Sequence, residues 1–329
     1  MARHLSFEEQ ALHYLVRPHE QVPAGPIAGP VAWRRDDFDD ERAWTLELSA
    51  SSVAELEAAH DHARARGVTL RELRTEDFPL PQLAAQIAAW RDELLCGRGF
   101  LVVRGIPVAD WGEEKSSFIY WGIGLHLGRP GAQNAQEDLL GHVIAAGEDA
   151  ENVYVRRYRT AGDIAYHCDL ADAVGLLCLQ TARSGGASRI VSSVSVFNVL
   201  QQRRPDLAAR LFEPVLIDRR DEAGSGPAYV PVFPCRYAGG QLRTFYHSDY
   251  FRSVVRHPDV PPFTPEQQAL FDTYEEIASS PELCLEMQFR RGDLQLVSNH
   301  LVLHARTAYE DYPDAARKRH LLRLWLSLT

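Results

Sequence analysis

Two histidines and one carboxylate are the side chains with which this chain could hold a redox-active metal. His167 and Asp169 stand two residues apart, and in an extended segment such residues point to the same face, so both can grip one ion. A second histidine from elsewhere in the chain would complete the triad found in non-heme Fe(II) oxygenases. Three protein ligands leave three coordination positions open, for a co-substrate and for dioxygen.

The His-x-Asp spacing occurs three times, at residues 167–169, 247–249 and 257–259, and about one occurrence is expected by chance at average residue usage. Residues 257–259 lie among prolines and are typical of a surface turn. The 247–249 triplet is the serious rival. If it does not bind the metal, residues 246–250 form either a loop on the substrate side of a pocket or an ordinary polar loop. Only the 167–169 triplet is followed by an apolar run, 174–179, and by a double-glycine turn.

His304 is the favoured second histidine, because it is followed by Arg319 and Arg323 just before the last apolar run. Arginine is always charged and can bind a carboxylate with two parallel hydrogen bonds. The alternative for either arginine is a surface ion pair. His300 competes with His304 as the ligand, and strand parity does not separate them, because an offset of four leaves both on one face. The His-x-Arg context and the spacing to Arg319 favour His304.

The elements that must position these residues change in type along the chain. Residues 1–50, rich in proline and glycine between 23 and 30, predict an extended arm or edge segment. Helices are expected at 51–67 (capped by Ser51 or Ser52), 81–95, 113–127, 196–211 and 265–277. Strands are expected at 100–103, 174–179, 188–194, 294–297, 301–303 and 321–328. An α-rich beginning that leads into a β-rich core predicts an α+β chain built around a sandwich or barrel.

Composition narrows the classes of function. The chain has 329 residues and a formal net charge of −10, which disfavours a nucleic-acid partner. Five cysteines without a Cys-x-x-Cys pair make a disulfide framework or a structural zinc site improbable and favour a reducing, cytoplasmic setting. We expect no signal peptide and no membrane span, since no apolar run is long enough.

Four patches of the chain resemble one known family. Residues 166–169, 185–188 (Gly-Gly-Ala-Ser), the 99–105 segment, and His304 with its two arginines are similar to the TauD/TfdA (taurine dioxygenase, clavaminate synthase-like) family of Fe(II)/2-oxoglutarate oxygenases. The likeness spans roughly residues 98–328. It implies a double-stranded β-helix, or jelly-roll, core with flanking helices. The expected organisation is a single domain, 1–329, with an N-terminal arm and helices at 1–97 and the core at 98–329.

The resemblance also implies roles for individual residues. His167, Asp169 and His304 match the iron ligands of the family. Arg319 matches the arginine that pairs with the distal carboxylate of 2-oxoglutarate, and Ser188 stands where the family often has a threonine that contacts it. Arg323 matches a second arginine, which binds an anionic substrate in some members and supports the site in others.

By the same resemblance, the chain would be a dioxygenase that uses Fe(II), 2-oxoglutarate and dioxygen. It would hydroxylate, or desaturate, an unactivated C–H bond of a small substrate such as an amino acid or natural-product intermediate, and convert 2-oxoglutarate to succinate. Asp169 favours these outcomes over halogenation. Four residues before the triplet could line the pocket mouth or form a charged strand edge: Tyr154, Arg156, Arg157 and Tyr158. The alternatives are a metal-dependent hydrolase and a non-catalytic binding member of the fold.

Overall fold

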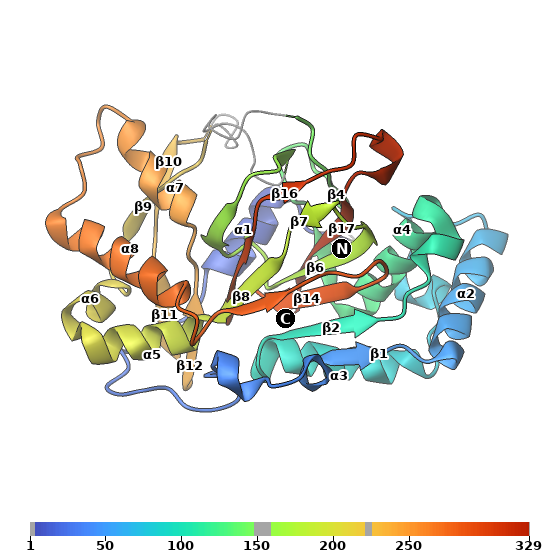
Figure 1. Cartoon of the computed structure of the whole chain (residues 1–329), viewed down its shortest axis with the longest axis horizontal. Helices are drawn as coiled ribbons and strands as arrows, with labels where there is room; N and C mark the ends of the chain where they lie inside the picture. The colour runs from blue at the N-terminus through green and yellow to red at the C-terminus, as the bar shows by residue number, and fades with distance from the viewer. Residues whose placement is uncertain (1–3, 148–158, 221–225, 329) are drawn as a thin grey trace.

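Two facing β-sheets form the centre of the molecule (Figure 1), in a computed structural model that describes residues 4–147, 159–220 and 226–328. The larger sheet has the order β1-β2-β14-β6-β17-β3, with β4 also paired to β17, and the smaller has the order β13-β8-β15-β5. All of these pairs are antiparallel except β1 with β2. This arrangement is the predicted α+β jelly-roll.

The strands of the larger sheet are β1 (Thr45–Glu47), β2 (Phe100–Arg104), β3 (Arg129–Gly131), β4 (Gly141–Val143), β6 (Ala173–Gln180), β14 (Leu294–Ser298) and β17 (His320–Ser327). Those of the smaller sheet are β5 (Ile164–His167), β8 (Ser188–Ser192), β13 (Leu285–Met287) and β15 (Val302–Arg306). Short two-stranded ladders join β9 (Val215–Asp218) to β10 (Tyr229–Val232), β11 (Cys235–Ala238) to β12 (Gln241–Thr244), and β7 (Ser184–Gly185) to β16 (Tyr309–Glu310).

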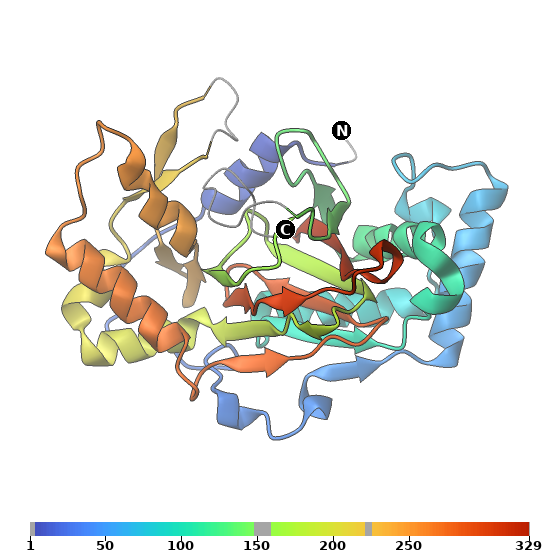
Figure 2. The same cartoon turned by 45° about the horizontal axis from the view of Figure 1, so that its top comes forward.

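Helices gather in two groups at opposite ends of the sheets, and both views show the separation (Figures 1 and 2). One group, α2 (Ala50–Ala65), α3 (Leu83–Cys96) and α4 (Val108–Leu127), covers the outer face of the larger sheet. The other contains α5 (Ser193–Arg203), α6 (Pro205–Arg210), α7 (Ser248–Ser253) and α8 (Pro265–Ala278), and it packs against the smaller sheet. No helix among the described residues is both long and apolar enough to cross a membrane.

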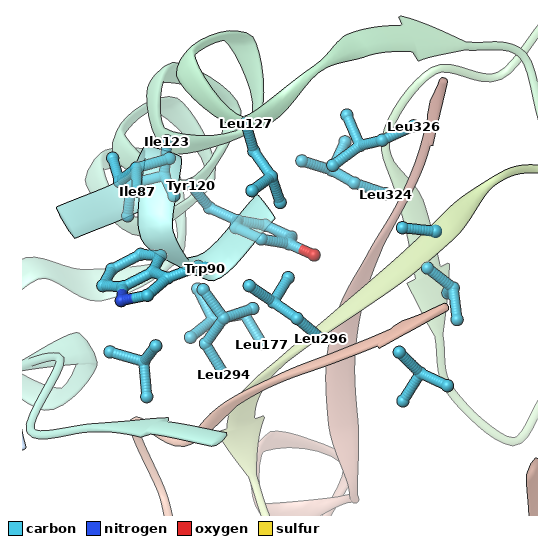
Figure 3. Packing of buried hydrophobic residues seen from close by; sticks show 14 of the residues in the cluster. Ile87, Trp90, Tyr120, Ile123, Leu127, Leu177, Leu294, Leu296, Leu324 and Leu326 are labelled. Atoms are coloured by element: carbon cyan, nitrogen blue, oxygen red, sulfur yellow. The ribbon is translucent and has the colours of Figure 1, made fainter. Parts of the chain in front are cut away.

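Strand β17 separates the core from the functional cavity. Leu324 and Leu326 point toward α4, where they lie near Tyr120 and Leu127 (Figure 3). Residues of opposite parity, Leu321, Arg323 and Trp325, line the cavity between the two sheets. Because side chains alternate along a strand, one eight-residue segment supplies apolar contacts to one side and polar groups to the other.

The N-terminal segment differs from the sequence prediction, because residues 1–50 are not simply an extended arm. Helix α1 (Phe7–Leu15) begins at a capping box in which Ser6 and Glu9 satisfy each other's backbone N–H groups. The ring of Phe7 stacks on Trp325 of β17, with centroids 6.4 Å apart. The prolines and glycines between residues 23 and 30 dominated the prediction, although they lie beyond this helix.

Smaller corrections concern element boundaries. Helix α2 is capped by Ser49 and not by Ser51 or Ser52. Val194, expected in a strand, lies in α5, and the helix expected at 196–211 is divided into α5 and α6 at Pro205, which lacks an N–H and starts the second helix. The predicted division between an N-terminal part, 1–97, and a core, 98–329, would separate β1 from β2. These two strands are hydrogen-bonded neighbours in one sheet. That the chain forms a single domain stays a prediction.

Candidate active site

The structure brings His167, Asp169 and His304 together at the inner face of the smaller sheet. His167 ends β5 and is paired directly with His304 of β15, so the centroids of the two imidazole rings lie 4.1 Å apart. Asp169 follows β5, and its Oδ2 is 3.7 Å from Nε2 of His304. One ligand atom of each residue lies within 4.8 Å of the others, as a shared metal ion requires.

Burial and charge favour the metal-binding forms of His304 and Asp169. Burial, reinforced by the neighbouring His167, lowers the pKa of His304 to about 3. Burial opposes ionisation of Asp169, but Arg323, His304 and His167 together hold the pKa of Asp169 below its ordinary value. At neutral pH His304 is therefore neutral and Asp169 is charged, which are the forms that bind metal. Oδ2 of Asp169 is buried and has no hydrogen-bond partner among the described residues, as expected if a cation is its partner.

A polar network beneath the triad fixes the loop that carries Asp169. The side chain of Asn299 accepts a hydrogen bond from the backbone N–H of Asp169 at 3.0 Å and donates to the carbonyl of Ala171 at 2.9 Å. The buried carboxylate of Asp172 contacts His300 at 2.8 Å and His13 of α1 at 2.9 Å, and it accepts a hydrogen bond from Arg17. His300, the rival ligand, is thus held by Asp172 outside the triad.

The rival triplets lie apart from this group. His247 forms a β-bridge with His167 and its ring is 5.0 Å away, so it borders the triad without joining it. His257 contacts the buried carboxylate of Asp218 at 3.1 Å and does not line the cavity. Within the described parts of the chain a second group with metal-ligand spacing, Glu113, His142 and His320, is largely exposed.

Ser188 and Arg319 lie at one end of the same cavity. Arg319 is 4% exposed, and its guanidinium lies over the ring of Tyr309 at 5.1 Å. Within the part of the chain that the structure describes, its Nη1 has no hydrogen-bond partner. The double glycine makes room for it: a Cβ on Gly186, whose φ is +73°, would lie 3.2 Å from Nε of Arg319. Ser188 donates its hydroxyl hydrogen to Gln295 at 3.0 Å, which leaves the oxygen able to accept.

Arg306 is a third polar residue at this end, and the sequence analysis did not single it out. It follows His304 by two residues on β15, faces the same cavity and is paired across the sheet with Ser188. Its Nη2 donates to the carbonyl of Thr160 at 2.8 Å, while Nε and Nη1 are buried and have no partner in residues 4–147, 159–220 and 226–328. Burial and the nearby Arg319 lower the pKa of Arg306 to about 10. Two buried guanidinium groups with unpaired nitrogens fit a bound carboxylate such as that of 2-oxoglutarate.

Arg323 contacts Asp169 of the triad. Its Nε donates to Gln133 at 2.7 Å, and its Nη1 lies 3.9 Å from Oδ1 of Asp169. The guanidinium also lies 5.3 Å from the centre of the Trp325 ring. The four residues expected at the pocket mouth lie outside the described residues: Tyr154, Arg156, Arg157 and Tyr158.

A second end of the cavity lies beyond the edge of the smaller sheet. The β-pairing places His304, His167 and His247 in one row across neighbouring chain segments. Tyr250 of α7 stacks on His247 with centroids 3.9 Å apart, and Arg220 lies over Tyr250 at 4.4 Å. The sequence analysis anticipated a substrate-side loop at 246–250 but had no signal for Arg220, which reaches the site from the end of β9.

Comparisons with known proteins agree with this site. The family described as "Taurine catabolism dioxygenase TauD, TfdA family" matches residues 64–325. The FR-33289 synthase of Streptomyces rubellomurinus is 32% identical over 316 residues, which are 92% of this chain and 91% of the relative.

Two solved structures have a similar fold. Asparagine oxygenase, in complex with Fe(II), 2S,3S-3-hydroxyasparagine and succinate, aligns with a TM-score of 0.70 and 16% identity, over 87% of this chain and 94% of its own. The non-heme iron oxygenase OrfP, in complex with Fe and alpha-ketoglutaric acid, aligns with a TM-score of 0.64 and 14% identity, over the same shares.

The family match covers most of the chain, including all three residues of the triad and both Arg319 and Ser188. It confirms an oxygenase that depends on Fe(II), 2-oxoglutarate and dioxygen, and it sets aside both a hydrolase and a non-catalytic protein. This chain belongs to the taurine catabolism dioxygenase TauD, TfdA family.

Proposed function

We propose that the enzyme hydroxylates an unactivated C–H bond of a small, anionic or amino-acid-like molecule, and that it couples this step to the conversion of 2-oxoglutarate to succinate. His167, Asp169 and His304 would hold the iron. The observation that carries the proposal is the placement of this triad in the same cavity as the buried, unpaired Nη1 of Arg319. Names of relatives support a small substrate, since the asparagine oxygenase complex contains a hydroxylated amino acid.

The residues around the triad have separate tasks in this proposal. Arg319 and Ser188 would bind the distal carboxylate of 2-oxoglutarate, and Arg306 would add a second guanidinium beside it. Arg323 would orient the Asp169 carboxylate, because its contacts go to Asp169 and Gln133. Iron with bound 2-oxoglutarate and dioxygen supplies the oxidising power, while the protein supplies orientation and a water-poor cavity.

An anaerobic titration tests the iron site. Addition of Fe(II) and 2-oxoglutarate to the purified protein should produce the weak charge-transfer absorption of the chelate. The substitutions His167→Ala and His304→Ala should abolish this absorption, whereas His247→Ala should retain it. If His247→Ala abolishes the absorption and His304→Ala retains it, the assignment of ligands is wrong.

A succinate-release assay tests the reaction. The enzyme with Fe(II), ascorbate and 2-oxoglutarate should release succinate above its background rate only when a substrate is added. A panel of amino acids and small organic acids, scored in this way and then analysed by mass spectrometry for a gain of one oxygen atom, would identify the substrate. A product that has lost two hydrogen atoms instead would identify a desaturase.

A further inference from the structure

Arg220 is a charged residue of the cavity that the proposed function does not use. Its side chain is 8% exposed, and it lines the cavity that contains the triad. Its Nε donates to the Ser253 hydroxyl at 3.3 Å and its Nη2 to the backbone carbonyl of Asp249 at 2.9 Å. Both acceptors are uncharged, and the nearby carboxylate of Asp218 pairs with Arg256 and His257. Nη1 makes no hydrogen bond within the described residues, so this guanidinium keeps donor capacity for a ligand.

The backbone at Arg220 is also unusual. Its φ is +48°, in the left-handed region that side chains other than glycine seldom adopt. The backbone N–H of Arg220 donates to Oδ1 of Asp218 at 3.0 Å, which holds the turn at the end of β9 in this conformation. A strained, over-determined position of this kind fixes the direction of a side chain, here across the ring of Tyr250.

Charge in the cavity is unbalanced. Among the described residues, its lining includes four arginines, at 220, 306, 319 and 323, against one carboxylate, that of Asp169. Arg323 is within ion-pair distance of Asp169, and 2-oxoglutarate would neutralise the end that contains Arg319 and Arg306. Among the described residues that line the cavity, Arg220 is therefore the arginine with no carboxylate within ion-pair distance and no co-substrate group assigned to it, which argues for a negatively charged group on the substrate.

We propose that Arg220, lying on the Tyr250 ring, binds an oxyanion of the substrate, either a carboxylate or a phosphate or phosphonate group. The inference rests on the proposed function, since it takes the opposite end of the cavity as the site of 2-oxoglutarate. Arg220 lies beyond the β5 edge of the smaller sheet, whereas Ser188 lies on β8 on the other side of β15. An extended substrate would thus place its anion past His247 and Tyr250 and its reacting carbon next to the triad.

The test is a binding experiment on the protein loaded anaerobically with Fe(II) and saturating 2-oxoglutarate. Propionate and propylphosphonate serve as probes, and calorimetry gives their dissociation constants. Wild type should bind at least one probe, and the preferred probe identifies the anion as a carboxylate or a phosphonate-type group. Arg220→Gln should weaken this binding roughly ten- to hundredfold, because hydrogen bonds to charged groups are lost. Arg220→Lys should recover part of the affinity.

Arg252→Gln is the matched control. Arg252 also anchors α7, through Asp272 at 2.9 Å and Glu275 at 3.0 Å, but it does not line the cavity. The Arg252→Gln substitution should leave probe affinity unchanged. An equal loss of affinity in Arg220→Gln and Arg252→Gln would mean that Arg220 acts only by holding α7. Probe binding that is absent in wild type, or unchanged in Arg220→Gln, overturns the inference. The charge-transfer absorption decides separately on the proposed function, since its absence in wild type would contradict that function whatever Arg220 does.

Discussion

The two ends of the cavity are built in different ways. Ser188 and Arg306 are direct neighbours in a regular ladder, and Arg319 immediately precedes β17. Arg220 and Tyr250, at the other end, come from a turn after β9 and from the six-residue helix α7. At the first end, strand register fixes the positions of the residues. At the second end, their positions depend on side-chain contacts between short segments. The co-substrate end should therefore be rigid, and the substrate end should be the part that can be changed independently.

Loss of a metal ligand should affect both ends at once. Asp169→Ala removes the carboxylate at which Arg323 and the two histidines converge, so we expect metal affinity and turnover to fall by more than about 100-fold, since loss of an outer partner alone costs roughly 10–100-fold. Metal titration and succinate release measure these losses. If the Asp169→Ala variant retained its metal affinity, Asp169 would not be the residue that links the two ends of the cavity.

Arg319→Gln should affect only the co-substrate end. We expect the dissociation constant of 2-oxoglutarate to rise roughly 10- to 100-fold, because a charge-assisted, bidentate hydrogen bond is lost. Probe binding at Arg220 should be unchanged once 2-oxoglutarate is saturating. Calorimetry with each ligand measures both values, and a parallel loss of probe affinity would contradict the separation of the ends.

Tyr250→Leu should produce a smaller effect, confined to the substrate end. It removes the ring face beneath Arg220, and a cation–π contact of this kind contributes about 0.5–2 kcal/mol. We expect probe affinity to fall by a few-fold to about 20-fold, while the affinity for 2-oxoglutarate and the charge-transfer absorption stay as in wild type.

Gly186→Ala should give the smallest change in ligand binding. An added Cβ would crowd Nε of Arg319 at 3.2 Å, and the positive φ costs a non-glycine residue about 1–2 kcal/mol. Thermal unfolding should show this loss, accompanied by a few-fold weaker binding of 2-oxoglutarate. Gly239→Ala is the control, because its φ is +55° with nothing within 4 Å of the added Cβ. It should lose stability without losing 2-oxoglutarate affinity.

The contrast between an end built from paired strands and an end built from a turn and a short helix explains what could be predicted from the sequence. The spacing of His167 and Asp169 anticipated that both would reach one site, although β5 ends at His167 and Asp169 lies beyond the strand. The arrangement of His304 and Arg319 anticipated that both would reach one cavity. Period two on β15 could also have revealed Arg306, since it lies two residues after His304. The iron-ligand and 2-oxoglutarate roles themselves stay proposals until the titrations are made.

Arg220 could not be found in this way. Its position depends on the left-handed turn after β9 and on acceptors from Asp249 and Ser253, about 30 residues further along the chain. Helix α1 was missed for a different reason: the prediction for residues 1–50 rested on the prolines and glycines between 23 and 30 and did not consider the Ser6–Glu9 capping box.

Helix α1 has a practical consequence for handling the protein. Phe7 lines the cavity and stacks on Trp325, while His13 and the neighbouring Arg17 contact the buried Asp172. Trimming the first 20 residues as a dispensable leader would remove part of the cavity wall and leave a buried carboxylate short of two partners. Purification tags are for the same reason better placed at a distance from this helix, where they cannot interfere with its packing.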